Sequence, residues 1–177
     1  GILMMNSYAD AQPGFVVIGI DVQSQLDSFW DDSNGNCLYE TVLQSLYNTS
    51  KTVRSVPFWN AFLERFDHDP LYTAVGSYDA INLYAHAINQ SQSLDPADII
   101  AEIETIDVNN PLAGAGGMAA FTRSHDIFEG YPFGYTLFVQ WQTNGQKAVV
   151  PAYGNPYPNE IATGSYLLPQ WPGWEFN

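Results

Sequence analysis

The feature that most constrains the fold is a short apolar run that ends on an acid. Residues 15–20 read FVVIGI, five of these six residues are large and apolar, and Asp21 follows at once. The turn-forming pair Pro13 and Gly14 precedes the run. A continuous apolar run of this length predicts a strand that is buried on both faces, as in the interior of a parallel sheet.

The position directly after such a strand is where α/β proteins place their ligand contacts. Ligands bind outside the carboxyl ends of the strands in open α/β sheets, so Asp21, Val22 and Gln23 are candidate contact residues. A carboxylate there can hold a ligand ammonium by charge-assisted hydrogen bonds. A structural role is equally open from position alone, because Asp21 could cap the helix predicted to start near Ser24 or face solvent.

The rest of the chain mixes helical and strand patterns. Predicted helices cover residues 2–11, 24–32, 55–66, 77–90 and 95–106, with caps at Ser24, Ser55, Ser77 and Asp95. Strands are predicted at residues 38–43 and in a late hairpin, 135–142 and 148–152, which turns at Asn144-Gly145. The last 25 residues predict an ordered but irregular tail. This order indicates α/β layering, and its few strands are typical of a chain that begins in the middle of a fold.

Composition excludes several classes of function. The chain has 19 acidic but only five basic residues, a formal charge of −14, which argues against nucleic-acid partners and anionic membrane surfaces. Its apolar stretches are too short to span a bilayer, so direct membrane insertion is not expected. Apolar residues make up 46% of the chain, enough for a real core. Cys37, the single cysteine, is interpreted as a small buried apolar residue.

No catalytic, metal or cofactor motif is complete. His68, His86 and His125 are scattered, and the acidic stretch at residues 31–36 lacks the glycine and glutamate of a calcium loop. The glycine-rich segment at residues 114–118 lacks phosphate-loop spacing and predicts a flexible or tightly turned loop. Carboxylate pairs are inevitable among 19 acids, so spacing identifies none. We therefore predict no enzyme, no cofactor and no metal.

The ordered succession of motifs carries a family resemblance. VVIGIDVQSQLDSFWDDSNG, then VPFWNAFLERFDHDPLYTAVGSYDAINLYAHAI, then the FVQWQTNGQKAVVP hairpin resembles the branched-chain amino-acid group of type 1 periplasmic (extracellular) solute-binding proteins. The resemblance implies a clamshell of two three-layer αβα lobes, of which this chain is the C-terminal half. It assigns residues 1–42 to lobe 2, 43–120 to lobe 1, and 121–177 to lobe 2 again. It also implies that an N-terminal half is missing.

The same resemblance implies the site. In the family, an acid after the lobe-two strand binds the α-ammonium of the ligand, and Asp21 matches that position, with Val22 and Gln23 beside it. Asp21 is one methylene shorter than the glutamate of relatives. An aromatic near the start of the Tyr-Asp-Ala helix lines the side-chain pocket, and Tyr72 is the candidate, with Thr73 next to it. Tyr78 is a second candidate that could instead belong to the core.

The implied function is binding of a small solute, with an ABC permease as partner in the full-length protein. The ligand would be an amino acid or a related polar molecule, bound between the lobes by hinge closure, outside the cytoplasm. Two N-x-[ST] sequons, at Asn48 and Asn89, are compatible with that location. This chain alone is expected to bind ligand weakly. The alternatives are a sensory-receptor ectodomain, a carboxylate-dependent hydrolase and a purely structural interaction domain.

Overall fold

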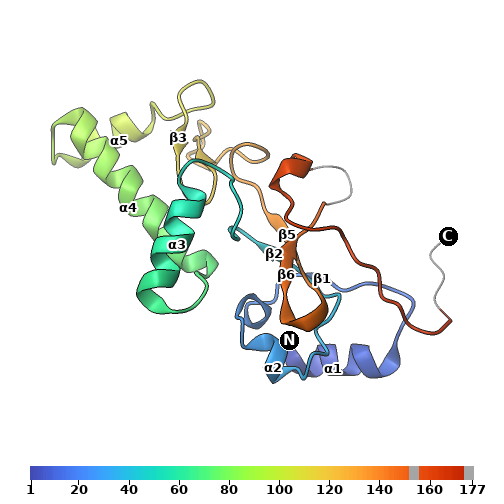
Figure 1. Cartoon of the computed structure of the whole chain (residues 1–177). Helices are drawn as coiled ribbons and strands as arrows, with labels where there is room; N and C mark the ends of the chain where they lie inside the picture. Colours follow the sequence, from blue (N-terminus) through green and yellow to red (C-terminus); the bar gives the residue numbers. More distant parts are fainter. Residues whose placement is uncertain (152–155, 174–177) are drawn as a thin grey trace. The chain divides into compact units, whose positions relative to one another are not determined.

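The chain folds into two compact units. The computed structural model describes residues 1–151 and 156–173 (Figure 1). Unit 1 comprises Gly1–Tyr47 and Thr136–Asn177, and unit 2 comprises Asn48–Tyr135. The lobe boundaries implied by the resemblance, near residues 42 and 120, stay predictions.

Unit 1 is built on a four-stranded sheet of order β1-β2-β5-β6. Its strands are β1 (Ile18–Gly19), β2 (Thr41–Gln44), β5 (Leu137–Trp141) and β6 (Lys147–Val149). β1 runs parallel to β2, whereas β5 is antiparallel to both β2 and β6. The helices and turns are α1 (Ile2–Ala11), η1 (Gln23–Gln25), α2 (Phe29–Asp32), η2 (Thr143–Gly145) and η3 (Asn159–Ile161).

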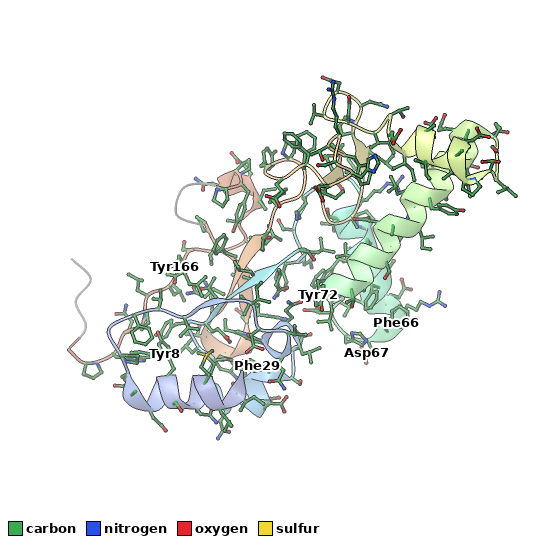
Figure 2. All side chains as sticks on the ribbon, turned by 180° about the vertical axis from the view of Figure 1, so that it is seen from behind. Tyr8, Phe29, Phe66, Asp67, Tyr72 and Tyr166 are labelled. Atoms are coloured by element: carbon green, nitrogen blue, oxygen red, sulfur yellow. The ribbon has the colours of Figure 1, made fainter. Side chains whose placement is uncertain are left out.

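One apolar cluster joins the helices of unit 1 to its sheet. Tyr8 of α1 and Phe29 of α2, both labelled in Figure 2, belong to a buried group with Val42 of β2 and Trp141 of β5. Burial of such side chains stabilises by roughly 1.5–3 kcal/mol each. Cys37 lies in the same cluster, and burial raises the pKa of its thiol to about 11. The interpretation of Cys37 as a buried apolar residue is therefore confirmed.

Two predicted elements near Asp21 differ from the structure. The predicted buried strand at 15–20 is reduced to β1, in which Ile18 is 48% exposed, and Ile20 just beyond it is 78% exposed. Within the described residues β1 has one neighbouring strand, so an apolar run alone does not make it a central strand. The predicted helix at 24–32 is also wrong. It is interrupted between η1 and α2, where Leu26 is extended, and Ser24 is buried instead of capping.

The late hairpin is confirmed. Its turn residues Asn144 and Gly145 both have positive φ, 62° and 71°, the backbone that favours an Asn-Gly turn between antiparallel strands. A Cβ at Gly145 would lie 3.0 Å from the Trp30 ring, so the glycine also gives room for that contact.

Unit 2 is mainly helical. It contains α3 (Ser55–Phe66), α4 (Tyr72–Ser91), α5 (Pro96–Ile103) and the antiparallel pair β3 (Leu112–Ala113) and β4 (Met118–Ala119). α5 starts as predicted, because the Asp95 carboxylate accepts a hydrogen bond from the Ala97 N–H at 2.8 Å. α4 starts earlier than predicted, at Tyr72, which leaves Ser77 inside the helix and not at its cap.

The glycine-rich loop of unit 2 is a tight turn held by an acid of α4. The Asp79 carboxylate accepts hydrogen bonds from the backbone N–H groups of Ala115 and Gly116, at 2.6 and 2.8 Å. Gly114 has no room for a side chain, since a Cβ there would lie 2.6 Å from Asp79 Oδ2. Asp79 therefore fixes the loop between β3 and β4, and Gly114 makes that contact possible.

Replacing Gly114 by Ala should destabilise the chain by about 1–3 kcal/mol, because the new methyl group displaces a carboxylate that satisfies two backbone donors. Gly76→Ala is the matched control: it lies inside α4 with open space around it, so it should stabilise by about 0.5–1 kcal/mol. Urea unfolding of the 177-residue chain measures both. Equal effects of the two substitutions would contradict the assigned role of Asp79.

Candidate functional site

Asp21 lies two residues after β1, and its two carboxylate oxygens face different groups. Oδ1 accepts a hydrogen bond from the Gln23 N–H at 3.0 Å, which closes the turn into η1. Oδ2 lies 3.4 Å from the Gly1 amino group and has no hydrogen-bond partner among the described residues. The side chain is 15% exposed. One oxygen thus closes the turn, and the other lies near the N-terminal amino group of the 177-residue chain.

Val22 and Gln23 flank this carboxylate, and both are exposed. Gln23 is the first residue of η1. Its side-chain oxygen and Asp21 Oδ2 both crowd Gly1, where a Cβ would lie 2.9 and 2.5 Å from them. The three adjoining candidates therefore form one surface turn at the end of β1.

Buried hydrogen bonds from β5, from β6 and from the residue before β2 fix that turn to the rest of unit 1. Ser24 is fully buried, and its hydroxyl donates to Glu40 Oε2 at 2.7 Å. The Trp141 indole N–H reaches both Ser24 Oγ (2.8 Å) and the Ser24 carbonyl oxygen (3.1 Å). Lys147 Nζ donates to the Gln25 carbonyl at 3.0 Å. The start of β2 and the late hairpin together anchor the turn that carries Asp21.

Glu40 is the most perturbed acid of unit 1. It is 2% exposed, and burial raises its pKa to about 7. The Ser24 hydrogen bond lowers the pKa, the negative charge of Asp21 raises it, and the Gly1 amino group lowers it. Glu40 therefore exchanges its proton near neutral pH. Sequence reasoning missed this residue, although an acid inside the predicted strand at 38–43 was an available signal.

The two aromatic candidates belong to unit 2. Tyr72 is the first residue of α4 and is 48% exposed; Figure 2 labels it together with Phe66 and Asp67 of the α3–α4 turn. Tyr78 is 37% exposed, and its ring centroid lies 4.6 Å from that of Phe58 in α3. Tyr78 thus has a packing role between helices. The assignment of Asp21, Val22, Gln23, Tyr72 and Tyr78 to a ligand site stays a prediction.

Unit 2 has a buried cation that sequence reasoning also missed. Lys51 is 7% exposed, donates to the Tyr135 carbonyl at 2.6 Å and lies 4.0 Å from the centre of the Tyr135 ring. Burial lowers its pKa to about 7, and the negative charge of Asp79 opposes that shift. The scarcity of bases in this acidic chain was the one available signal.

The described residues also form a pocket in unit 2. This pocket, of about 640 Å³, is lined by Ile100 and Ile103 of α5, Phe121, and the pair Glu104 and His125, whose Oε1 and Nε2 are 2.9 Å apart. None of the described His, Cys, Asp and Glu side chains gather in threes that could hold a metal ion. None of the described helices has the length and apolar character needed to cross a membrane.

Comparisons with known proteins give the fold. Neither a family model nor a curated protein sequence matches the chain significantly. A putative branched-chain amino acid ABC transporter from Silicibacter pomeroyi is similar in structure, with a TM-score of 0.72 and 15% identity over 96% of this chain and 44% of that one. A leucine-binding protein from Thermotoga maritima has a TM-score of 0.64 and 14% identity, covering 82% of this chain and 39% of that one.

A third solved structure names the fold. The type 1 periplasmic binding protein from Bordetella pertussis has a TM-score of 0.60 and 16% identity, covering 82% of this chain and 41% of that one. The chain has part of the type 1 periplasmic-binding-protein fold. It spans about two fifths of the length of these three proteins. The predicted α/β fold class and the resemblance are thereby confirmed, for a part of the type 1 fold.

The buried Glu40 predicts how stability varies with pH. The folded state keeps the Glu40 proton up to about pH 7, whereas the unfolded chain loses it near 4.5. Between these values the folded state binds more protons, so the free energy of unfolding falls as pH rises, and the full penalty is present above pH 7. At about 1.4 kcal/mol per pH unit, that penalty is on the order of 3 kcal/mol.

Glu40→Gln removes this penalty and keeps an oxygen to accept the Ser24 hydroxyl. The variant should exceed the wild type in stability by about 1–3 kcal/mol at pH 8, and the advantage should fall below about 1 kcal/mol at pH 5. Urea unfolding of the 177-residue chain at both pH values measures the difference. Glu160→Gln, at an exposed position of the same unit, is the control. A difference that does not change with pH would exclude an ionised, buried Glu40.

Proposed function

We propose that this chain is part of an extracytoplasmic solute-binding protein of an ABC-type importer. The observation that carries the proposal is the similarity in fold to binding proteins named for leucine and branched-chain amino acids. The solute is an amino acid or a similar small polar molecule. It binds between two lobes that close about a hinge.

The carboxylate of Asp21 supports an amino-acid ligand. Its Oδ1 is engaged by the Gln23 N–H, and its Oδ2 is left to the Gly1 amino group. Oδ2 has no hydrogen-bond partner among the described residues. An ionised carboxylate and an ammonium form a strong hydrogen bond, particularly where little water competes. The α-ammonium of an amino acid is the group we assign to this oxygen, with Val22 and Gln23 as its neighbours.

The aromatic candidates in this proposal are Tyr72 and Tyr78 of α4. Tyr72 presents about half of its surface to solvent at the start of α4, so its ring is available to a ligand side chain. Tyr78 packs against Phe58 and is the second aromatic candidate. Apolar and aromatic surface with few polar groups is the usual composition of a small-molecule site.

Binding, rather than chemistry, is the mechanism. A ligand that contacts both lobes in the closed form, and one lobe in the open form, shifts the population toward closure by its difference in affinity. The permease then recognises the closed protein outside the cytoplasm. Such a role needs neither a catalytic residue nor a cofactor.

Asp21→Asn tests the proposal in the full-length gene product. Titration calorimetry with leucine should show affinity reduced about 10- to 100-fold, because a charge-assisted hydrogen bond is worth about 1.5–3 kcal/mol. Affinity for 4-methylpentanoate, which is leucine without its amino group, should change little. Asp10→Asn, an exposed acid of α1, is the control for net charge. If Asp21→Asn lowers stability but leaves leucine affinity intact, Asp21 is a cap only.

A further inference from the structure

We propose that Glu40 is the positioning residue of the solute site: its buried carboxylate holds the turn that carries Asp21 and places a second negative charge behind it. The inference rests on the proposed function, because it concerns the affinity of that same site for an ammonium. It extends the site from the surface turn to the start of β2. Its basis is the set of buried hydrogen bonds around Ser24.

Glu40 is linked to Asp21 through Ser24, which lies three residues after Asp21 in the same turn. Glu40 Oε2 accepts the Ser24 hydroxyl at 2.7 Å, and Ser24 belongs to η1, which the Asp21 carboxylate caps at Gln23. Ser24 in turn accepts the indole N–H of Trp141 at 2.8 Å. With Ser24 fully buried and Trp141 1% exposed, the chain of hydrogen bonds is shielded from water. Movement of Glu40 would therefore displace the turn as a whole.

The charged and titratable groups around Glu40 come from several elements. Asp21 follows β1 and the Cys37 thiol lies ahead of β2; each interacts electrostatically with Glu40, as does the N-terminal amino group of the 177-residue chain. The Cys37 thiol stays neutral because burial raises its pKa to about 11. Lys147 of β6 forms an ion pair with Asp27, whose Oδ1 lies 2.7 Å from its Nζ. Glu40 is thus the group that changes charge near neutral pH.

Two consequences follow for an ammonium at Asp21. An ionised Glu40 strengthens the negative potential at Asp21 Oδ2, and a bound ammonium in return favours the ionised form of Glu40. A protonated Glu40 keeps the Ser24 contact but removes the charge. Affinity for an amino acid should therefore rise with pH through the range in which Glu40 ionises, whereas a purely structural Glu40 would give an affinity independent of its charge.

The test is the pH profile of leucine binding to the full-length gene product and to its Glu40→Gln variant. Calorimetry between pH 6 and pH 8 should show about tenfold tighter binding at pH 8 for the wild type. The affinity of the variant should not change with pH, and it should stay close to the affinity that the wild type has at pH 6. The two proteins differ only at residue 40, so the difference between their two profiles isolates Glu40. Glu160→Gln should reproduce the wild-type profile.

A second measurement does not depend on ligand. The indole N–H resonance of Trp141, assigned by its loss in Trp141→Phe, should shift with pH around 7 in the wild type and stay constant in Glu40→Gln. Parallel pH profiles for wild type and Glu40→Gln, or an indole resonance that titrates equally in both, would overturn the positioning role. Absence of leucine binding by the wild type at every pH, with the indole shift present, would instead overturn the proposed function and this inference with it.

Discussion

The pairing of β5 with β2 is the interaction on which unit 1 depends. Thr41 lies opposite Gln140, so two segments separated by the whole of unit 2 become neighbours in one sheet. Without β5, β2 would lose one of its two partners, and the cluster around Val42 would lose Trp141. Trp141 also fixes the turn after β1 through its indole N–H. One strand therefore completes the sheet, fills the core and supports the candidate site.

Local signals were sufficient to predict elements whose cause is local. The Asp95-Pro96 start of α5 and the Asn144-Gly145 turn of the hairpin depend on backbone preferences within a few residues, and both match the structure. β1 and the segment at 24–32 do not match, because their conformations depend on distant partners. The place of β1 in the sheet is set by strand order, and Ser24 is drawn inward by Glu40 and Trp141. Strand order and buried polar partners cannot be read from periodicity.

In the candidate site, too, the part that depends on local sequence was predictable and the part that depends on distant partners was not. The position of Asp21 after a strand was predictable, because the rule for ligand sites depends on sequence order alone. The residues that support Asp21 were not predictable, because Glu40, Ser24 and Trp141 are far apart in the sequence and come into contact only in the folded chain. In unit 2 likewise, the glycine-rich segment was recognisable as a loop, but the carboxylate that holds it comes from Asp79 in the middle of α4. Residues that touch a ligand can carry a sequence signature, whereas residues that position them carry little.

Glu40 of unit 1 and Lys51 of unit 2 are both buried, and they act in opposite directions on stability. Glu40 lowers the free energy of unfolding as pH rises from about 4.5 to 7. Lys51 raises it from about pH 7 to 10.5, because there the unfolded state still holds a proton that the folded state has released. The two contributions together place a minimum of stability near neutral pH. A group that reduces stability can be the cost of a function, and the positioning of the turn that carries Asp21 is the function we propose for Glu40.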